Sequence, residues 1–186
     1  MKVRLIAAML ALAVAPAVVR AAEEENPYKK VKVGDFATYK MTTTFGGNKY
    51  EGTVTQTIKA KNDKEATIEV ISKVNGTELK AQETKIDLTK PYDPTKAANL
   101  PAGTDAKVEK VKEGKEKIKV GGKEYETTWT TYTVKAKAGD KDVDADVKSW
   151  MAKDVPTGMV KMTMSADIGG QKMEMTMELK EAGNKK

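Results

Sequence analysis

Hydrophobic and polar residues alternate with a period of two along most of the chain beyond residue 35, whereas helical periodicity is nearly absent. The alternation is clearest in the segments 36–45, 50–60 and 65–74. Successive side chains of a strand point to opposite faces of a sheet, so this period predicts half-buried strands. The residues expected to share the buried side are Ala37, Tyr39, Met41 and Phe45 in the first segment, Tyr50, Gly52, Val54, Gln56, Ile58 and Ala60 in the second, and Ala66, Ile68, Val70 and Val74 in the third.

Short glycine- and asparagine-containing stretches separate the alternating segments, at 46–48, 61–64, 75–76, 121–122 and 169–170. Asn-Gly and Gly-Gly pairs supply the positive φ angles that tight hairpins need. The pattern therefore predicts an all-β chain, in which one antiparallel sheet of about ten strands is accompanied by at most one or two short helices.

One long stretch breaks the alternation. The segment 90–105 contains three prolines and no period of two, which predicts a long loop between about four strands before it and about six after it. This loop, or one of the short helices, is expected to cover one face of the sheet.

The first residues have the features of a secretory signal peptide. Lys2 and Arg4 precede an apolar segment of 15 residues at 5–19, and small residues follow at Ala21 and Ala22, where cleavage is expected. The apolar segment is short for a bilayer core, which needs about 20 residues. The expected domains are a signal peptide at 1–21 and a single antiparallel β domain at 22–186.

This leader predicts export to the periplasm or the extracellular space of a bacterium, with no integral membrane span after cleavage. Arg20 lies beside the cleavage site, so retention of the leader as an N-terminal anchor is the alternative.

The charge balance argues against nucleic acid as a partner. Removal of Lys2, Arg4 and Arg20 with the leader lowers the number of basic residues from 33 to 30, against 27 acidic residues, and the net charge from +6 to +3. Lysine and glutamate also alternate at 107–120, whereas nucleic-acid binders concentrate one sign of charge. We interpret this segment as a solvated face.

The chain has no histidine and no cysteine, and it has no arginine beyond the leader. Disulfides, Ser-His-Asp and Cys-His catalytic groups and ordinary zinc sites are therefore excluded. Paired carboxylates could still hydrolyse glycosides, but no pair stands out among the acidic residues. We expect a protein that is not an enzyme and that needs no cofactor.

Aspartates occupy every second position in the segment 140–146, which raises the question of a calcium site. An EF-hand loop that began at Asp140 would need glycine at position six and glutamate at position twelve, where this chain has Ala145 and Met151. The sequence instead predicts a strand whose aspartates point to solvent, namely Asp140, Asp142, Asp144 and Asp146.

Methionines line both arms of a hairpin that is predicted around the Gly-Gly turn at 169–170. Alternation places Met162 and Met164 on one face of the first arm, and Met173, Met175 and Met177 on one face of the second. Such a patch has three interpretations: plain core, the lining of an apolar groove, or a Cu(I) site, since thioethers are soft ligands. A copper site would need a capping residue, for which Trp129 and Trp150 are the candidates.

The block "SWMAKDVPTGMVKMTM", preceded by "GKEKIKVGGKEYETTW" and followed by "MTMELKEAG", resembles a family of uncharacterised secreted bacterial proteins. These proteins have a Trp, then a Val-Pro-x-Gly-x-Val-Lys stretch, and they end on a strand with Glu-Leu. The opening "VGDFATYKM" fits their first strand, so the resemblance covers most of the mature chain.

This family is in turn similar to the LolA/LolB-like lipoprotein carriers. The similarity implies a strongly curved antiparallel sheet, an incomplete barrel whose concave face holds acyl chains. The carriers use an arginine in gating, and the mature chain has none. The resemblance thus implies the fold and a hydrophobic groove, and not lipoprotein transport itself.

The sequence therefore predicts an exported, non-enzymatic binding protein that holds a lipid or another apolar ligand on a concave sheet face. The alternatives are a structural or interaction protein of the cell envelope with a solid methionine-rich core, and a Cu(I)-binding protein. The residues expected to line the groove are Tyr39, Met41, Trp129, Trp150, Met162, Met164, Met173, Met175 and Met177.

Overall fold

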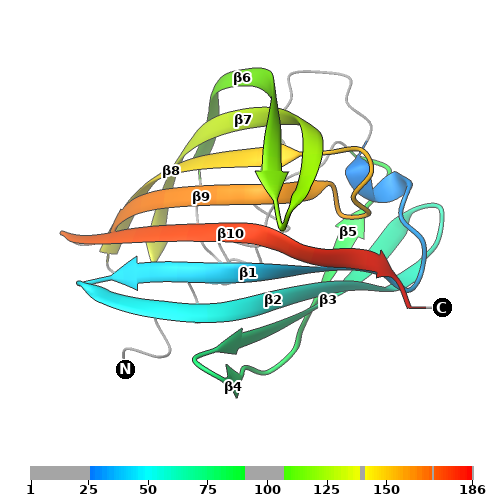
Figure 1. Ribbon diagram of the computed structural model, residues 1–186, viewed down its shortest axis with the longest axis horizontal. Helices are drawn as coiled ribbons and strands as arrows, with labels where there is room; N and C mark the ends of the chain where they lie inside the picture. The colour runs from blue at the N-terminus through cyan, green and yellow to red at the C-terminus, as the bar shows by residue number, and fades with distance from the viewer. Residues whose placement is uncertain (1–25, 91–106, 139–140, 169, 186) are drawn as a thin grey trace.

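The computed structural model describes residues 26–90, 107–138, 141–168 and 170–185 (Figure 1). The predicted signal peptide, nearly all of the proline-rich loop and Asp140 lie outside these ranges. The elements are the 3₁₀ turn η1 (Pro27–Lys29) and the strands β1 (Asp35–Phe45), β2 (Asn48–Lys61), β3 (Glu65–Val74), β4 (Thr77–Glu78), β5 (Gln82–Asp87), β6 (Lys107–Val120), β7 (Lys123–Ala138), β8 (Lys141–Met151), β9 (Met159–Ile168) and β10 (Gln171–Asn184).

The strands form one antiparallel sheet in the order β4-β3-β2-β1-β10-β9-β8-β7-β6, and β5 also pairs with β3. This confirms the predicted fold class. The first described strand, β1, pairs with the last, β10, and both lie in the middle of the sheet (Figure 1). Among the described residues, five strands precede the proline-rich segment and five follow it, where about four and about six were expected. The first half contains the short strands β4 and β5, which both pair with β3.

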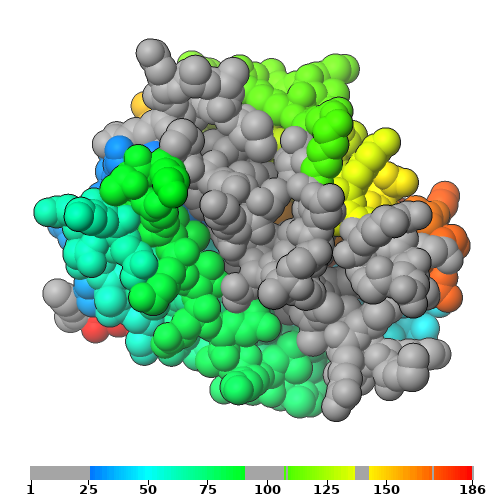
Figure 2. All heavy atoms as spheres, turned by 180° about the vertical axis from the view of Figure 1, so that it is seen from behind, coloured from blue at the N-terminus to red at the C-terminus, as the bar shows by residue number. Residues whose placement is uncertain are grey.

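The sheet curves strongly but does not close. Within the described ranges β6 pairs only with β7, while β4 and β5 pair only with β3. Figure 2 shows the consequence: seen from behind, β3 to β5 lie along one side of the molecule, and β6 to β8 lie along the other. No helix in the described part of the chain has the length and apolar character needed to cross a bilayer.

The backbone angles confirm the predicted turns at 46–47, 75–76 and 121–122. Asn75 and Gly76 have φ angles of 48° and 82°, and Gly46 and Gly47 have φ angles of 54° and 79°. Positive φ at both central residues matches the right-handed twist of the flanking strands and allows two-residue hairpins. These turns join β1 to β2 and β3 to β4 as antiparallel neighbours.

The alternating residues build two apolar clusters. The larger one lies on the inward faces of β1 and β7 to β10 and includes all the predicted methionines. The smaller one packs Tyr28 and Val31, in and after η1, against inward residues of β2, β3 and β5. Asn26 caps η1 by accepting a hydrogen bond from the Tyr28 amide, and its side chain donates to the Asp87 carbonyl. The sequence just before β1 is thereby fixed to one end of the sheet.

Candidate functional site

Strand register brings the methionines into adjacent rows. Met41, Met177 and Met162 are direct neighbours across β1, β10 and β9, and Met175 is the neighbour of Met164 in the next row. We define the methionine face as Met41, Met162, Met164, Met173, Met175 and Met177; each of these side chains is at most 4% exposed. The structure therefore confirms that the methionines of both hairpin arms gather on one buried side.

Tyr39 lies on β1, at the inward position before Met41. Its side chain is fully buried, and its hydroxyl lies 2.5 Å from Oγ1 of Thr157 and donates to the carbonyl oxygen of Met159 at 3.2 Å. These bonds hold the turn between β8 and β9 against β1, and Val155 of the same turn enters the larger cluster. Burial raises the pKa of Tyr39 well above its ordinary value, so the hydroxyl stays neutral.

A buried polar atom lies beside the methionine face. Thr43 follows Met41 on the inward side of β1 and is 4% exposed, with Tyr50 and Met175 as its cross-strand neighbours. Its Oγ1 is buried and has no hydrogen-bond partner among the described residues. Thr43 thus places a buried hydroxyl next to Met175 of the methionine face.

The two tryptophans lie on the opposite face of the sheet, so the prediction that they line the groove or cap a copper site was wrong. Trp150 pairs with Lys161 of β9 and with Trp129 of β7, and it belongs to neither apolar cluster. The alternation of β8 explains this, because Ser149 points inward beside Met162 and its successor must point outward.

The outward tryptophans fasten the bent β6–β7 hairpin to the sheet. The ammonium of Lys148 lies 4.5 Å from the ring centre of Trp129 and 4.4 Å from that of Trp150, within the range of cation–π attraction. Glu116 of β6 accepts hydrogen bonds from the Trp150 indole and from Lys148. Both hydrogen bonds lower the pKa of Glu116, and the bond from the Trp150 indole has the larger effect. In Figure 1 the tip of the hairpin accordingly crosses in front of the sheet.

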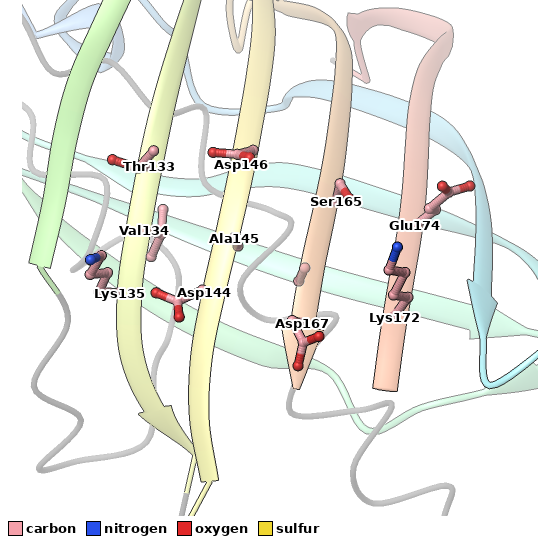
Figure 3. A pocket seen from close by; sticks show the side chains of 11 residues that line it. Thr133, Val134, Lys135, Asp144, Ala145, Asp146, Ser165, Asp167, Lys172 and Glu174 are labelled. Carbon is pink, nitrogen blue, oxygen red and sulfur yellow. The ribbon is translucent and has the colours of Figure 1, made fainter. Parts of the chain in front are cut away.

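A shallow cleft of about 350 Å³ crosses the outward face of β7 to β10 (Figure 3). Lys135, Asp144, Asp167 and Lys172 form one row across these strands, with the two lysines outermost. Asp144 and Asp146 are exposed, as predicted; Asp142 is part of β8, but its side chain is outside the described set. Among the residues placed in the structure, no three acidic side chains are grouped so that they could hold a metal ion.

Sequence reasoning missed three residues of these sites. Thr43 could have been found by continuing the alternation of Tyr39 and Met41 by one step. Met159, which is fully buried, stands at the bend that starts β9, where alternation gives no guide. The position of Glu116 beside Trp150 depends on the bend of the β6–β7 hairpin, for which its strand sequence has no signal.

Two solved structures share this fold. One is a protein of Bacteroides fragilis NCTC 9343 that is inferred to be exported and has a YmcC-like fold; it is 9% identical, with a TM-score of 0.52, over 83% of this chain and 97% of its own. The other, inferred to be a lipoprotein, is from Parabacteroides distasonis ATCC 8503; it is also 9% identical, with a TM-score of 0.53, over 87% of this chain and 100% of its own.

No model of a known protein family matches the chain, and no curated protein matches it. At 9% identity the two structures support a common fold and nothing about ligands. The similarity to the LolA/LolB-like carriers stays a prediction.

Proposed function

We propose that the chain is an exported, non-enzymatic binding protein that holds an apolar ligand, such as a lipid or an acyl chain, against the methionine face. The observation on which this proposal depends is the methionine face itself: six methionines on the inward side of a curved sheet that does not close. Methionine has three rotatable bonds and a polarizable sulfur, so the same side chains can pack against one another or around a guest of variable shape.

Two further observations support the proposal. The Tyr39–Thr157 contact holds the turn between β8 and β9 against β1, the strand that contributes Met41, which would give a bound chain a fixed surface to lie against. The leader at 1–21 has the features of a signal peptide, and both structural neighbours are inferred to be an exported protein or a lipoprotein. These features support the proposal that the protein works in the bacterial envelope, in the periplasm or outside the cell.

Native mass spectrometry of the purified protein tests the proposal, together with titration by diphenylhexatriene, a hydrocarbon that fluoresces only in apolar surroundings. We expect a co-purified lipid mass, or saturable diphenylhexatriene binding that a lipid extract displaces. Met175→Ala should weaken this binding, and Met151→Ala, outside the methionine face, is the matched control. A protein with no bound lipid and no saturable binding would contradict the proposal.

One observation favours a second candidate, a structural or interaction protein of the envelope with a solid core. Residues of the methionine face are at most 4% exposed, as in a well-packed interior. In that case the probe should not bind, and Met175→Ala should affect stability alone. The diphenylhexatriene titration therefore distinguishes the two candidates: the binding protein should bind the probe and the structural protein should not.

A further inference from the structure

The buried hydroxyl of Thr43 is the feature of the methionine face that packing does not explain. Thr43 lies in the row formed by Tyr50, Thr43, Met175 and Met164 across β2, β1, β10 and β9. Its side chain is 4% exposed, and Oγ1 has no partner among the residues that the structure describes. Valine would fill nearly the same volume without a polar atom, so packing alone gives no reason for threonine here.

An unsatisfied hydroxyl inside a protein is unfavourable, because the group loses its hydrogen bonds to water and gains none. Native structures contain few such atoms, and a ligand or a water that binds there is a usual explanation. A hydrocarbon could not satisfy Thr43. A ligand with an oxygen at this depth could, and its chain would then lie along Met175 and Met164.

The charge of the ligand follows from the same surroundings. The cross-strand neighbours of Thr43 on this face are a methionine and a tyrosine, and neither is a cation. Transfer of an ionised carboxylate to such a site would be far more costly than transfer of a neutral alcohol or ester. A single hydroxyl can supply the hydrogen bond that a neutral alcohol or ester oxygen needs at this site.

We propose that Thr43 is the polar contact of the ligand site, and that the ligand is a neutral long-chain amphiphile whose hydroxyl or ester oxygen hydrogen-bonds Oγ1 of Thr43. This inference rests on the proposed function, because it names the ligand class of that same face. Thr84 provides an internal comparison: its Oγ1 is also buried without a described partner, but it lies on β5, opposite Ile68 and away from the methionines.

The experiment compares 1-dodecanol with diphenylhexatriene, measuring 1-dodecanol by displacement of the fluorescent probe. The measured quantity is the affinity for 1-dodecanol divided by the affinity for diphenylhexatriene, because only the alcohol can form a hydrogen bond with Thr43. Thr43→Val should lower this ratio about tenfold, the effect of one lost hydrogen bond. Thr43→Ser, which keeps the hydroxyl, should restore the ratio, and Thr84→Val should leave it unchanged. If Thr43→Val does not fold, Thr43→Ala gives the same comparison.

The outcomes distinguish a failure of the proposed function from a failure of the role proposed for Thr43. If neither probe binds the unsubstituted protein, the proposed function is wrong and this inference is wrong with it. If both probes bind and Thr43→Val leaves the ratio unchanged, the inference is wrong while the proposed function stands. Tighter binding of laurate than of 1-dodecanol at pH 8 would overturn the neutral class of ligand.

Discussion

Met175 lies near the centre of the methionine face, between Thr43 on β1 and Met164 on β9, and is 4% exposed. In a solid core, Met175→Ala should lower the free energy of unfolding by about 2 to 5 kcal/mol, because truncation leaves a cavity. In a ligand groove the loss should be smaller. Urea denaturation with and without a lipid extract measures the difference.

Met175→Leu is the matched variant, because it nearly conserves volume and should cost less than about 1.5 kcal/mol. It also removes a thioether, so it tests the Cu(I) hypothesis. Cu(I) titration of the unsubstituted protein and of this variant should show no tight site that depends on Met175. Tight binding that disappears in Met175→Leu would establish a copper site instead.

The buried hydroxyl of Tyr39 should make the stability of the protein depend on pH. Its hydroxyl keeps its proton to higher pH when folded than when unfolded, since burial raises its pKa. Its contribution to stability is therefore complete below about pH 10 and is lost as the pH rises above that value. Tyr39→Phe should lower the free energy of unfolding by about 1 to 3 kcal/mol at neutral pH, because it breaks the buried bond to Thr157.

Tyr39→Phe should also lose less stability at high pH than the unsubstituted protein does. Some loss should persist, because ion pairs also raise the pKa of Lys117 and of Lys123. Urea midpoints measured at several pH values from about 9 to 11 give this slope. Tyr50→Phe, at a half-buried tyrosine on the neighbouring strand, is the control, and an equal effect of the two variants would contradict the prediction.

At the scale of elements, the β6–β7 hairpin contains one close contact. The Trp129 ring lies directly over Gly114 of β6, so that a Cβ on Gly114 would lie 2.6 Å from its Cζ2 atom. Gly114→Ala should therefore displace the ring from Lys148 and cost about 1 to 3 kcal/mol, as overpacking does. Thermal unfolding and tryptophan fluorescence measure the two effects.

Gly183→Ala is the matched control, because a Cβ there would make an ordinary contact of 3.4 Å with Phe36. It should change stability little and leave the tryptophan spectrum unchanged. An equal loss of stability in both alanine variants would show that the ring does not depend on Gly114.

The sequence was a good guide to strands and a poor guide to how strands bend. Alternation identified most inward residues of β1, β2 and β3, such as Tyr39, Val54 and Ile68, because burial of one face imposes it. It failed at Ala60, which is exposed beyond an irregularity in the pairing of β2 with β3. The alternation along β8 also predicts that Trp150 points outward. We assigned Trp150 to the groove because it is aromatic, and that assignment was wrong. The contact of Glu116 with Trp150 joins residues 34 positions apart through a bend, which no local pattern encodes.

For the whole molecule, an open sheet exposes its edges to other chains. The edge strand β6 has lysines along its length, and charged edges oppose pairing with a second sheet. Replacing Lys115 and Lys119 by threonine should therefore produce larger species as the protein concentration rises. Light scattering after size exclusion measures this. The same exchange at Lys172 and Lys180 of β10, an interior strand, is the control and should leave the mass unchanged.

The burial of the methionine face has a consequence for oxidative damage. Hydrogen peroxide converts a thioether into a sulfoxide, which is polar and would disrupt an apolar interior. Met151 is half-buried, whereas Met162 and Met177 are at most 1% exposed, so the sheet protects them from oxidants in solution. Their sulfoxidation requires the face to open. The mass of each methionine peptide after timed exposure to peroxide is therefore a record of how often this sheet opens.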